Sequence, residues 1–262
     1  MKIVVCIKQV PDTTKVDIDE KTGVLKREGS ETKMNPYDLY ALETALRLRE
    51  EYGGEITALT MGPPQAETIL QEAYMMGVDS CVLLTDRAFA GADVLATSYA
   101  LAGAIQKIGT VDLVICGKQT TDGDTAQVGA EVAEFLDVPH VANVDEIISC
   151  ENAVIRVTTE LAESRQTLDV SFPCLLTVEK DIHIPRLPSY RKKLDCQSRP
   201  VKTIGLNDLR DNDPTHYGLN GSPTQVQKIY TPEATGEKIN VTGSGDEIAV
   251  YLYQKLKELK FI

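Results

Sequence analysis

The chain has 262 residues, of which 42% are hydrophobic, so it has ample material for a buried core and disorder is excluded as its main state. An excess of 39 acidic over 27 basic side chains gives a net charge of −12, which argues against nucleic-acid binding and a general membrane-surface role. No apolar run approaches the roughly 18 residues of a spanning helix. The run between Lys2 and Lys8 indicates a strand rather than a signal peptide.

Strand-like and helix-like segments alternate through the first half of the chain. Strands are expected at 2–10, 56–61, 81–84 and 111–116, with a small hairpin at 16–28. Helices are expected to begin at Asn35-Pro36 and to cover about 65–76, 92–108 and 124–136. Asn35 is a good N-cap, Pro36 is tolerated at the first helical position, and Asp38 favours the positive end of a helix.

This alternation predicts an α/β fold with an open, mostly parallel, doubly wound sheet covered by helices, Rossmann-like or adenine-nucleotide-hydrolase-like. In such sheets ligands bind at the carboxyl ends of the strands. The candidate loops are therefore those after Val10, Met61, Leu84 and Cys116.

The second half has a different character. Short strands at 141–148, 154–161 and 174–178 are expected as antiparallel additions to the sheet. The polar stretch 203–243 has no sustained period and predicts an arm without a core of its own. A final helix is expected after Ser244, with an apolar stripe of Ile248, Leu252, Leu256 and Leu259. We therefore expect a nucleotide-binding domain over 1–200 and a C-terminal arm over 201–262 whose helix lies on another subunit.

The cysteines and histidines do not have the spacing of a metal site. The six cysteines are scattered without a CxxC pair, and three of them (Cys6, Cys116 and Cys174) lie in apolar runs. They are typical of small buried residues in a reducing compartment, so we expect a cytoplasmic protein. The three histidines are far apart, and we expect no structural metal.

The loop at 117–128 follows a buried strand and opens a helix, a location that suits a phosphate. Gly117 and Gly123 let the backbone approach a ligand closely. Asp122 and Asp124 repel a naked phosphate, and N-capping is their alternative explanation. No Walker A or GxGxxG pattern is present, so an ordinary strand-to-helix connection stays open beside a nucleotide site. The loop reads Gly117-Lys118-Gln119-Thr120-Thr121-Asp122-Gly123-Asp124-Thr125-Ala126-Gln127-Val128.

Two further stretches also allow two interpretations. Asn35-Pro36-Tyr37-Asp38 is explained by helix capping, yet it offers an amide, a phenol and a carboxylate to a ligand. Met61-Gly62-Pro63-Pro64 is a turn or the lining of a pocket. No nucleophile–base constellation appears, so an independent hydrolase or kinase has no support.

The segment 185–202, called here the basic segment, is locally unlike the rest of the chain. It contains six basic residues and one aspartate, which gives it a net charge of +5. Apolar Leu187 and Tyr190 among these charges are typical of a docking loop, and a solvated basic loop is the alternative.

Together these motifs resemble the beta subunit of an electron-transfer flavoprotein, in order from residue 1 to about 205. The resemblance is carried by Val4-Val5-Cys6-Ile7-Lys8-Gln9-Val10-Pro11-Asp12, Met34-Asn35-Pro36-Tyr37-Asp38, Met61-Gly62-Pro63, the 117–128 loop and Arg186-Leu187-Pro188-Ser189-Tyr190.

The resemblance implies an obligate heterodimer with an alpha subunit and a nucleotide on this subunit. The residues that it implies for nucleotide binding are Cys6, Asn35, Pro36, Tyr37, Asp38, Met61 and every residue of the 117–128 loop. The small Gly123 and Ala126 resemble the bifurcating members, whose beta subunit holds FAD; the alternative is structural AMP in a single-flavin carrier. A nucleotide-binding regulatory module is a remote alternative.

For the bifurcating type the resemblance implies a division of electrons. They come from NADH and go to ferredoxin or flavodoxin and to a flavin dehydrogenase acting on an acyl-CoA or a 2-hydroxy acid. No side chain of this chain is expected to act as a catalytic acid or base. Leu187 is the expected apolar anchor for the dehydrogenase, within a docking set of Arg186, Leu187, Pro188, Tyr190, Arg191, Lys192 and Lys193.

Overall fold

The computed structural model describes residues 1–12, 32–196, 199–227 and 239–262. The hairpin expected at 16–28 lies outside these residues. The chain divides into two compact units, Met1–Gln227 and Lys228–Ile262, and each is described by itself.

The first unit is built on a nine-stranded sheet. Its strands are β1 (Lys2–Cys6), β4 (Glu55–Met61), β5 (Ser80–Leu84), β6 (Leu113–Gly117), β7 (His140–Glu151), β8 (Val154–Glu160), β9 (Arg165–Ser171), β10 (Cys174–Val178) and β11 (Val201–Ile204). Their order is β11-β5-β4-β1-β6-β10-β7-β8-β9. Every pair from β11 to β7 is parallel, and β8 and β9 continue antiparallel. A separate antiparallel pair joins β2 (Gln9–Pro11) to β3 (Thr32–Met34).

Helices cover both faces of this sheet, as the alternation predicts. They are α1 (Pro36–Tyr52), α2 (Glu67–Met76), α3 (Val94–Ile108) and α4 (Val128–Leu136). The short helix α5 (Tyr190–Cys196) packs against α2. Successive residues of β1 point to opposite faces. Ile3 and Val5 join the core under α1 and α2, and Val4 and Cys6 join the core under α3 and α4. The doubly wound α/β fold is confirmed.

Two expectations about the sheet and its helices are wrong. β10 and β7 are not antiparallel additions, because β10 inserts between β6 and β7 and runs parallel to both. After β8 and β9 the chain re-enters the sheet beside the start of β6, where Cys174 lies opposite Leu113. Helix α4 begins at Val128 instead of 124, because Asp124 and Ala126 adopt left-handed backbone angles, with φ of 52° and 55°.

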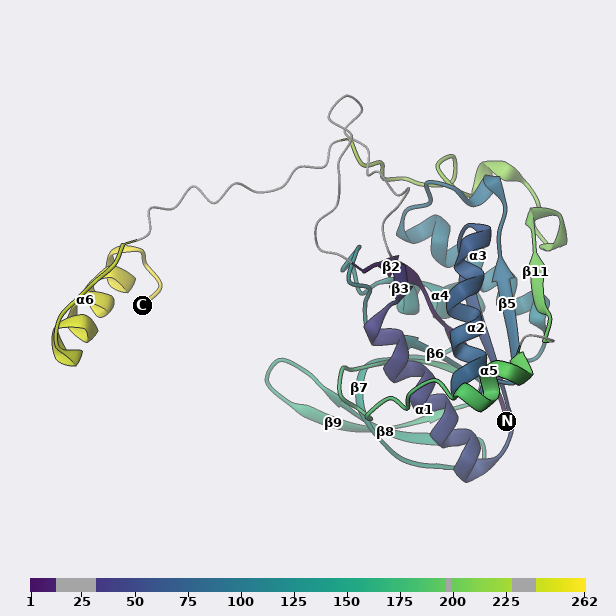
Figure 1. The fold of residues 1–262 in the computed structure, drawn as a ribbon, viewed down its shortest axis with the longest axis horizontal. Helices are drawn as coiled ribbons and strands as arrows, with labels where there is room; N and C mark the ends of the chain where they lie inside the picture. Colours follow the sequence, from purple (N-terminus) through teal and green to yellow (C-terminus); the bar gives the residue numbers. More distant parts are fainter. Residues whose placement is uncertain (13–31, 197–198, 228–238) are drawn as a thin grey trace. The chain divides into compact units, whose positions relative to one another are not determined.

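The first unit continues past residue 200, where the sequence places the domain boundary. β11 pairs with β5 at one edge of the sheet (Figure 1). Leu206, Leu209 and Tyr217 are buried in the core under α3. The Tyr217 ring contacts Phe89 at 5.4 Å between centroids. Residues 201–217 therefore share this core, which hydrophobic periodicity alone does not reveal.

The second unit contains α6 (Gly245–Glu258), which begins after Ser244 as predicted. Ser244 and Glu247 form a capping box, with the Ser244 N–H donating to Glu247 Oε2 at 2.8 Å. No residue of α6 is buried, and Ile248 and Leu252 are exposed. Among the residues that the structure describes, no helix is both long and apolar enough to cross a membrane.

Candidate nucleotide site

The sheet has a topological switch point between β1 and β6. The chain passes from β1 to β4 and β5 on one side and then returns to place β6 on the other side of β1. Cys6 and Cys116 face each other in register near the carboxyl ends of these two strands. Open α/β sheets bind ligands at such points, so the residues that follow β1 and β6 are the candidates for a ligand site.

Asn35 ties the start of α1 to the 117–128 loop. Its side chain is buried, and its Nδ2 donates to Asp38 Oδ1 at 3.0 Å and to the Gln119 carbonyl at 2.9 Å. Its Oδ1 accepts the Thr121 N–H at 3.2 Å. It occupies the N-cap position of α1, as predicted, but its side chain makes no cap hydrogen bond to the helix. The amide instead fixes the path of the 117–128 loop.

Asp38 extends this contact to the end of β1. The buried carboxylate accepts the Lys8 N–H at 2.7 Å through Oδ2. Burial raises the pKa of Asp38 to about 7, against the opposing effect of the hydrogen bonds from Asn35 and Lys8. Gly117 lies in close contact with the first turn of α1. A Cβ at this position would lie 2.6 Å from Asp38 Oδ1 and 2.7 Å from the Tyr37 carbonyl carbon. Only glycine permits this approach of β6 to α1.

The two aspartates of the 117–128 loop do not cap α4. Lys8 Nζ binds both Asp122 carboxylate oxygens, at 2.7 and 2.8 Å, and the Gln119 side chain donates to Asp124. Partial burial alone would raise the pKa of Asp122. The charge of Lys8 and the hydrogen bond that it donates outweigh this effect and hold the pKa of Asp122 below its usual value. The N-capping alternative is therefore wrong for both residues.

The N-terminus of α4 has no side-chain cap. Gln127 occupies the N-cap position and makes no cap hydrogen bond through its side chain. The N–H groups of the first turn have no partner within a helix, and they carry the positive end of its dipole. Residues 121–127 are exposed, and two of them (Asp124 and Ala126) hold left-handed angles of the kind that cluster at ligand sites.

The remaining predicted residues lie at the same edge of the sheet. Cys6 is buried at the end of β1, and its hydrogen bond to Cys116, together with burial, raises the pKa of the Cys116 thiol well above its ordinary value. Met61 is half-buried at the end of β4, where the Gly62 N–H donates to the Leu84 carbonyl at 3.1 Å. Pro36 and Tyr37 open α1. All these residues surround the carboxyl ends of β1, β4 and β6.

A nucleotide fits this edge chemically. Uncapped N–H groups suit phosphate, and the hydroxyls of Thr120, Thr121 and Thr125 suit phosphate or ribose. A Cβ at Gly123 would fit without a clash, since its nearest neighbour would be Thr120 Oγ1 at 3.4 Å.

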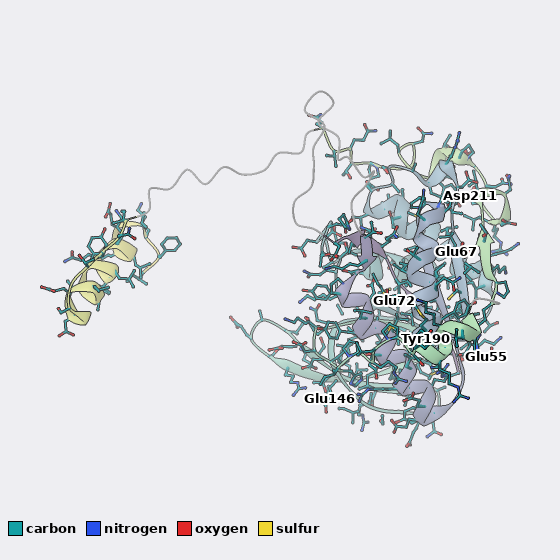
Figure 2. All side chains as sticks on the ribbon, viewed as in Figure 1. Glu55, Glu67, Glu72, Glu146, Tyr190 and Asp211 are labelled. Atoms are coloured by element: carbon teal, nitrogen blue, oxygen red, sulfur yellow. The ribbon has the colours of Figure 1, made fainter. Side chains whose placement is uncertain are left out.

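The docking residues divide into anchored and exposed groups. Arg186 Nε donates to Glu43 at 2.8 Å and its Nη1 donates to Glu50 at 2.5 Å. Lys192 Nζ donates to the Met76 carbonyl at 3.2 Å. Leu187, Pro188, Tyr190, Arg191 and Lys193 are exposed. Figure 2 labels Tyr190 at the start of α5, which packs against α2.

Sequence reasoning missed Lys8 and Glu43 as functional residues. Lys8 lies two residues after the end of β1, at the carboxyl end of that strand, where a ligand-side residue is expected. Glu43 lies four residues after Leu39 and beside Leu42 on the apolar stripe of α1. A carboxylate on an apolar helix face is a signal for a buried partner, because an unpaired buried charge is costly.

Comparisons with known proteins identify the family of the chain. The family model described as the electron transfer flavoprotein domain matches residues 22–208. The electron transfer flavoprotein subunit beta of Clostridium acetobutylicum is 44% identical over 262 residues, covering 100% of both chains. The caffeyl-CoA reductase-Etf complex subunit CarD of Acetobacterium woodii is 44% identical over 264 residues, also covering 100% of both. Protein FixA of Azorhizobium caulinodans is 41% identical over 271 residues, covering 99% of this chain and 96% of its own. The chain belongs to the electron transfer flavoprotein family, among its beta subunits.

Proposed function

We propose that this chain is the nucleotide-binding subunit of a cytoplasmic heterodimeric electron carrier, formed with an alpha subunit. The observation that carries the proposal is the edge of the sheet where β1 and β6 diverge. There the uncapped start of α4 follows the 117–128 loop, which Asn35 holds in place, and Asp38 binds the backbone beyond β1. The full-length similarity to beta subunits supports the same assignment. The five described free cysteines are all buried, which suits a reducing compartment.

The nucleotide that we propose is FAD. Gly123 and Ala126 are small, and small residues at these positions leave more room beside the phosphates, which a dinucleotide needs more than AMP does. When bound, FAD supplies hydride and single-electron chemistry. The chain holds it with the first-turn N–H groups of α4 and with hydroxyls of the loop, which Asn35 keeps in position.

The reaction that we propose is electron bifurcation. The heterodimer takes electrons from NADH and divides them between ferredoxin or flavodoxin and a flavin dehydrogenase that acts on an acyl-CoA or a 2-hydroxy acid. The relative CarD is a subunit of a caffeyl-CoA reductase-Etf complex, and this similarity favours an acyl-CoA partner. No side chain of this chain acts as a general acid or base in this proposal.

Cofactor analysis of the purified heterodimer tests the assignment. We expect two FAD per heterodimer after denaturation and chromatography. One FAD and one AMP would contradict bifurcation and favour a single-flavin carrier. A stable monomer holding ATP without flavin would contradict the electron-transfer role altogether.

A second test addresses the basic segment. Leu187 is 87% exposed, an unusual position for a leucine that nothing in the first unit covers. Replacing Leu187 by Ala should slow electron transfer to the dehydrogenase and leave flavin content and reduction by NADH intact. Loss of FAD in this variant would assign the basic segment to folding instead of docking.

A further inference from the structure

We infer that Arg186 is a positioning residue that fixes Leu187 for docking, and that its charge does not steer the dehydrogenase. The inference rests on the proposed docking function of the basic segment. The inference concerns how α1 holds the basic segment in place. It does not depend on the identity of the cofactor.

The Arg186 guanidinium is held by two carboxylates of α1. Glu43, whose side chain is 3% exposed, accepts Arg186 Nε at 2.8 Å, Nη2 at 3.1 Å and the backbone N–H at 3.1 Å. It also accepts Arg47 Nε at 3.0 Å. Glu50 accepts Nη1 at 2.5 Å and Nη2 at 3.2 Å. A fork with this many bonds fixes both the position and the orientation of the arginine.

The charges in this cluster are compensated. Burial raises the pKa of Glu43, but the hydrogen bonds from Arg186 and Arg47 bring it below its ordinary value. The hydrogen bond from Arg186 also lowers the pKa of Glu50. Both carboxylates are therefore ionised at neutral pH, and they cancel the field of Arg186 that an approaching partner would feel. Steering requires uncompensated charge on the surface.

A second anchor follows Leu187. The Ser189 N–H donates to the Met75 carbonyl at 3.0 Å. Lys192 Nζ donates to the carbonyl of Met76, so α2 holds the far side of the turn. Between the two anchors stand only Leu187 and Pro188, and proline restricts its own φ. The leucine is held outward before any partner arrives, which lowers the entropy lost on docking.

Arg191 provides the matched contrast within the basic segment. It is exposed, as is Lys193, and both are placed to act through charge on the surface. Positioning and steering then differ in two measurable ways. A positioning residue loses its effect once Leu187 is removed, whereas a steering residue keeps its effect. Steering weakens with salt, since the Debye length falls from about 10 Å at 0.1 M to about 3 Å at 1 M.

The experiment uses the complete heterodimer and a short-chain acyl-CoA dehydrogenase as the probe. Apparent KM and kcat for the heterodimer are measured with Arg186→Gln, Leu187→Ala, the double variant and Arg191→Gln. We expect Arg186→Gln to raise KM about tenfold with little change in kcat, and to add less than about twofold in the Leu187→Ala background. Its effect should persist at about 0.5 M salt, whereas the effect of Arg191→Gln should disappear.

Two outcomes would overturn the inference and leave the docking function intact. One is that the effects of Arg186→Gln and Leu187→Ala are additive, and the other is that salt abolishes the effect of Arg186→Gln. No effect of Leu187→Ala at all would refute the docking function and the inference with it. Glu50→Gln keeps the buried Glu43 and is the variant of choice if Arg186→Gln does not fold. It should speed hydrogen exchange at the backbone N–H of Arg186, and unchanged exchange would count against the anchor.

Discussion

Thr121 donates its backbone N–H to the side chain of Asn35 across 86 positions of sequence. This bond makes the start of α1 a structural part of the 117–128 loop, because the same amide also holds the Gln119 carbonyl. The candidate nucleotide site is thus built from two segments that a single buried side chain joins.

Replacing Asn35 by Ala should weaken nucleotide binding. The change removes two hydrogen bonds to the 117–128 loop, and leaving buried backbone groups unpaired costs about 1–3 kcal/mol. We expect roughly tenfold or greater loss of FAD affinity, measured by calorimetric titration of the nucleotide-free heterodimer. Asn207→Ala, at an exposed asparagine, is the control and should bind normally. Equal affinity in the two variants would show that Asn35 does not hold the loop.

Asp38 should give the stability of the nucleotide-free chain a specific pH dependence. Its pKa is about 7 in the folded chain against an ordinary 3.8, so the folded chain binds the extra proton between these values. The contribution of Asp38 to the free energy of unfolding therefore falls as pH rises from about 4 to 7.

Urea unfolding of the wild type and Asp38→Asn at pH 5 and pH 8 isolates this contribution. The variant cannot titrate at this position, so its free energy of unfolding should decline less between the two pH values. Asp112→Asn removes another carboxylate that accepts a strand N–H, from Lys2 at 2.7 Å, and serves as the comparison. Parallel pH profiles for the wild type and Asp38→Asn would contradict the prediction.

A larger side chain at position 123 should discriminate FAD from AMP. The backbone has room for a Cβ there, so the fold should tolerate Gly123→Val. We expect about tenfold or greater loss of FAD affinity with a smaller effect on AMP, the scale on which added methyl groups discriminate ligands. Gly123→Ala should give an intermediate ratio. A Val variant that binds FAD as well as the wild type does would remove the steric argument for FAD.

Deleting residues 244–262 should weaken assembly with the alpha subunit. The exposed Ile248, Leu252 and Leu259 need a surface to cover them, and each apolar side chain buried on assembly contributes about 1.5–3 kcal/mol. The dissociation constant should rise at least about tenfold, measured by analytical ultracentrifugation. Glu258→Gln, a polar change in the same helix, should assemble normally. Unchanged assembly of the deletion variant would refute the assignment of α6 to the alpha subunit.

The sheet core and its helices follow from local sequence. Short apolar runs such as 56–61 and helical stripes such as Leu39, Leu42 and Leu46 report burial directly, because their period matches the element. The position of the 117–128 loop follows for the same reason, since it lies between a buried strand and a helix. Local signals place these elements without any knowledge of their neighbours.

The partners of individual polar side chains are not local and were missed. Lys8 meets Asp122 across 114 positions, and Arg186 meets Glu43 across 143. The parallel direction of β10 likewise depends on where the chain re-enters the sheet after β8 and β9. Hydrophobic periodicity carries no information on these choices, because it describes which face is buried and not what lies against it.

Helix α1 supports both the 117–128 loop and the basic segment. Asn35 and Asp38 act at its start, and Glu43 and Glu50 act further along. A helix turns about 100° per residue, so one residue inserted between Asp38 and Glu43 would rotate Glu43 away from Arg186 while leaving Asp38 in place. The length of this stretch is therefore constrained, and we expect insertions or deletions there to disrupt the basic segment.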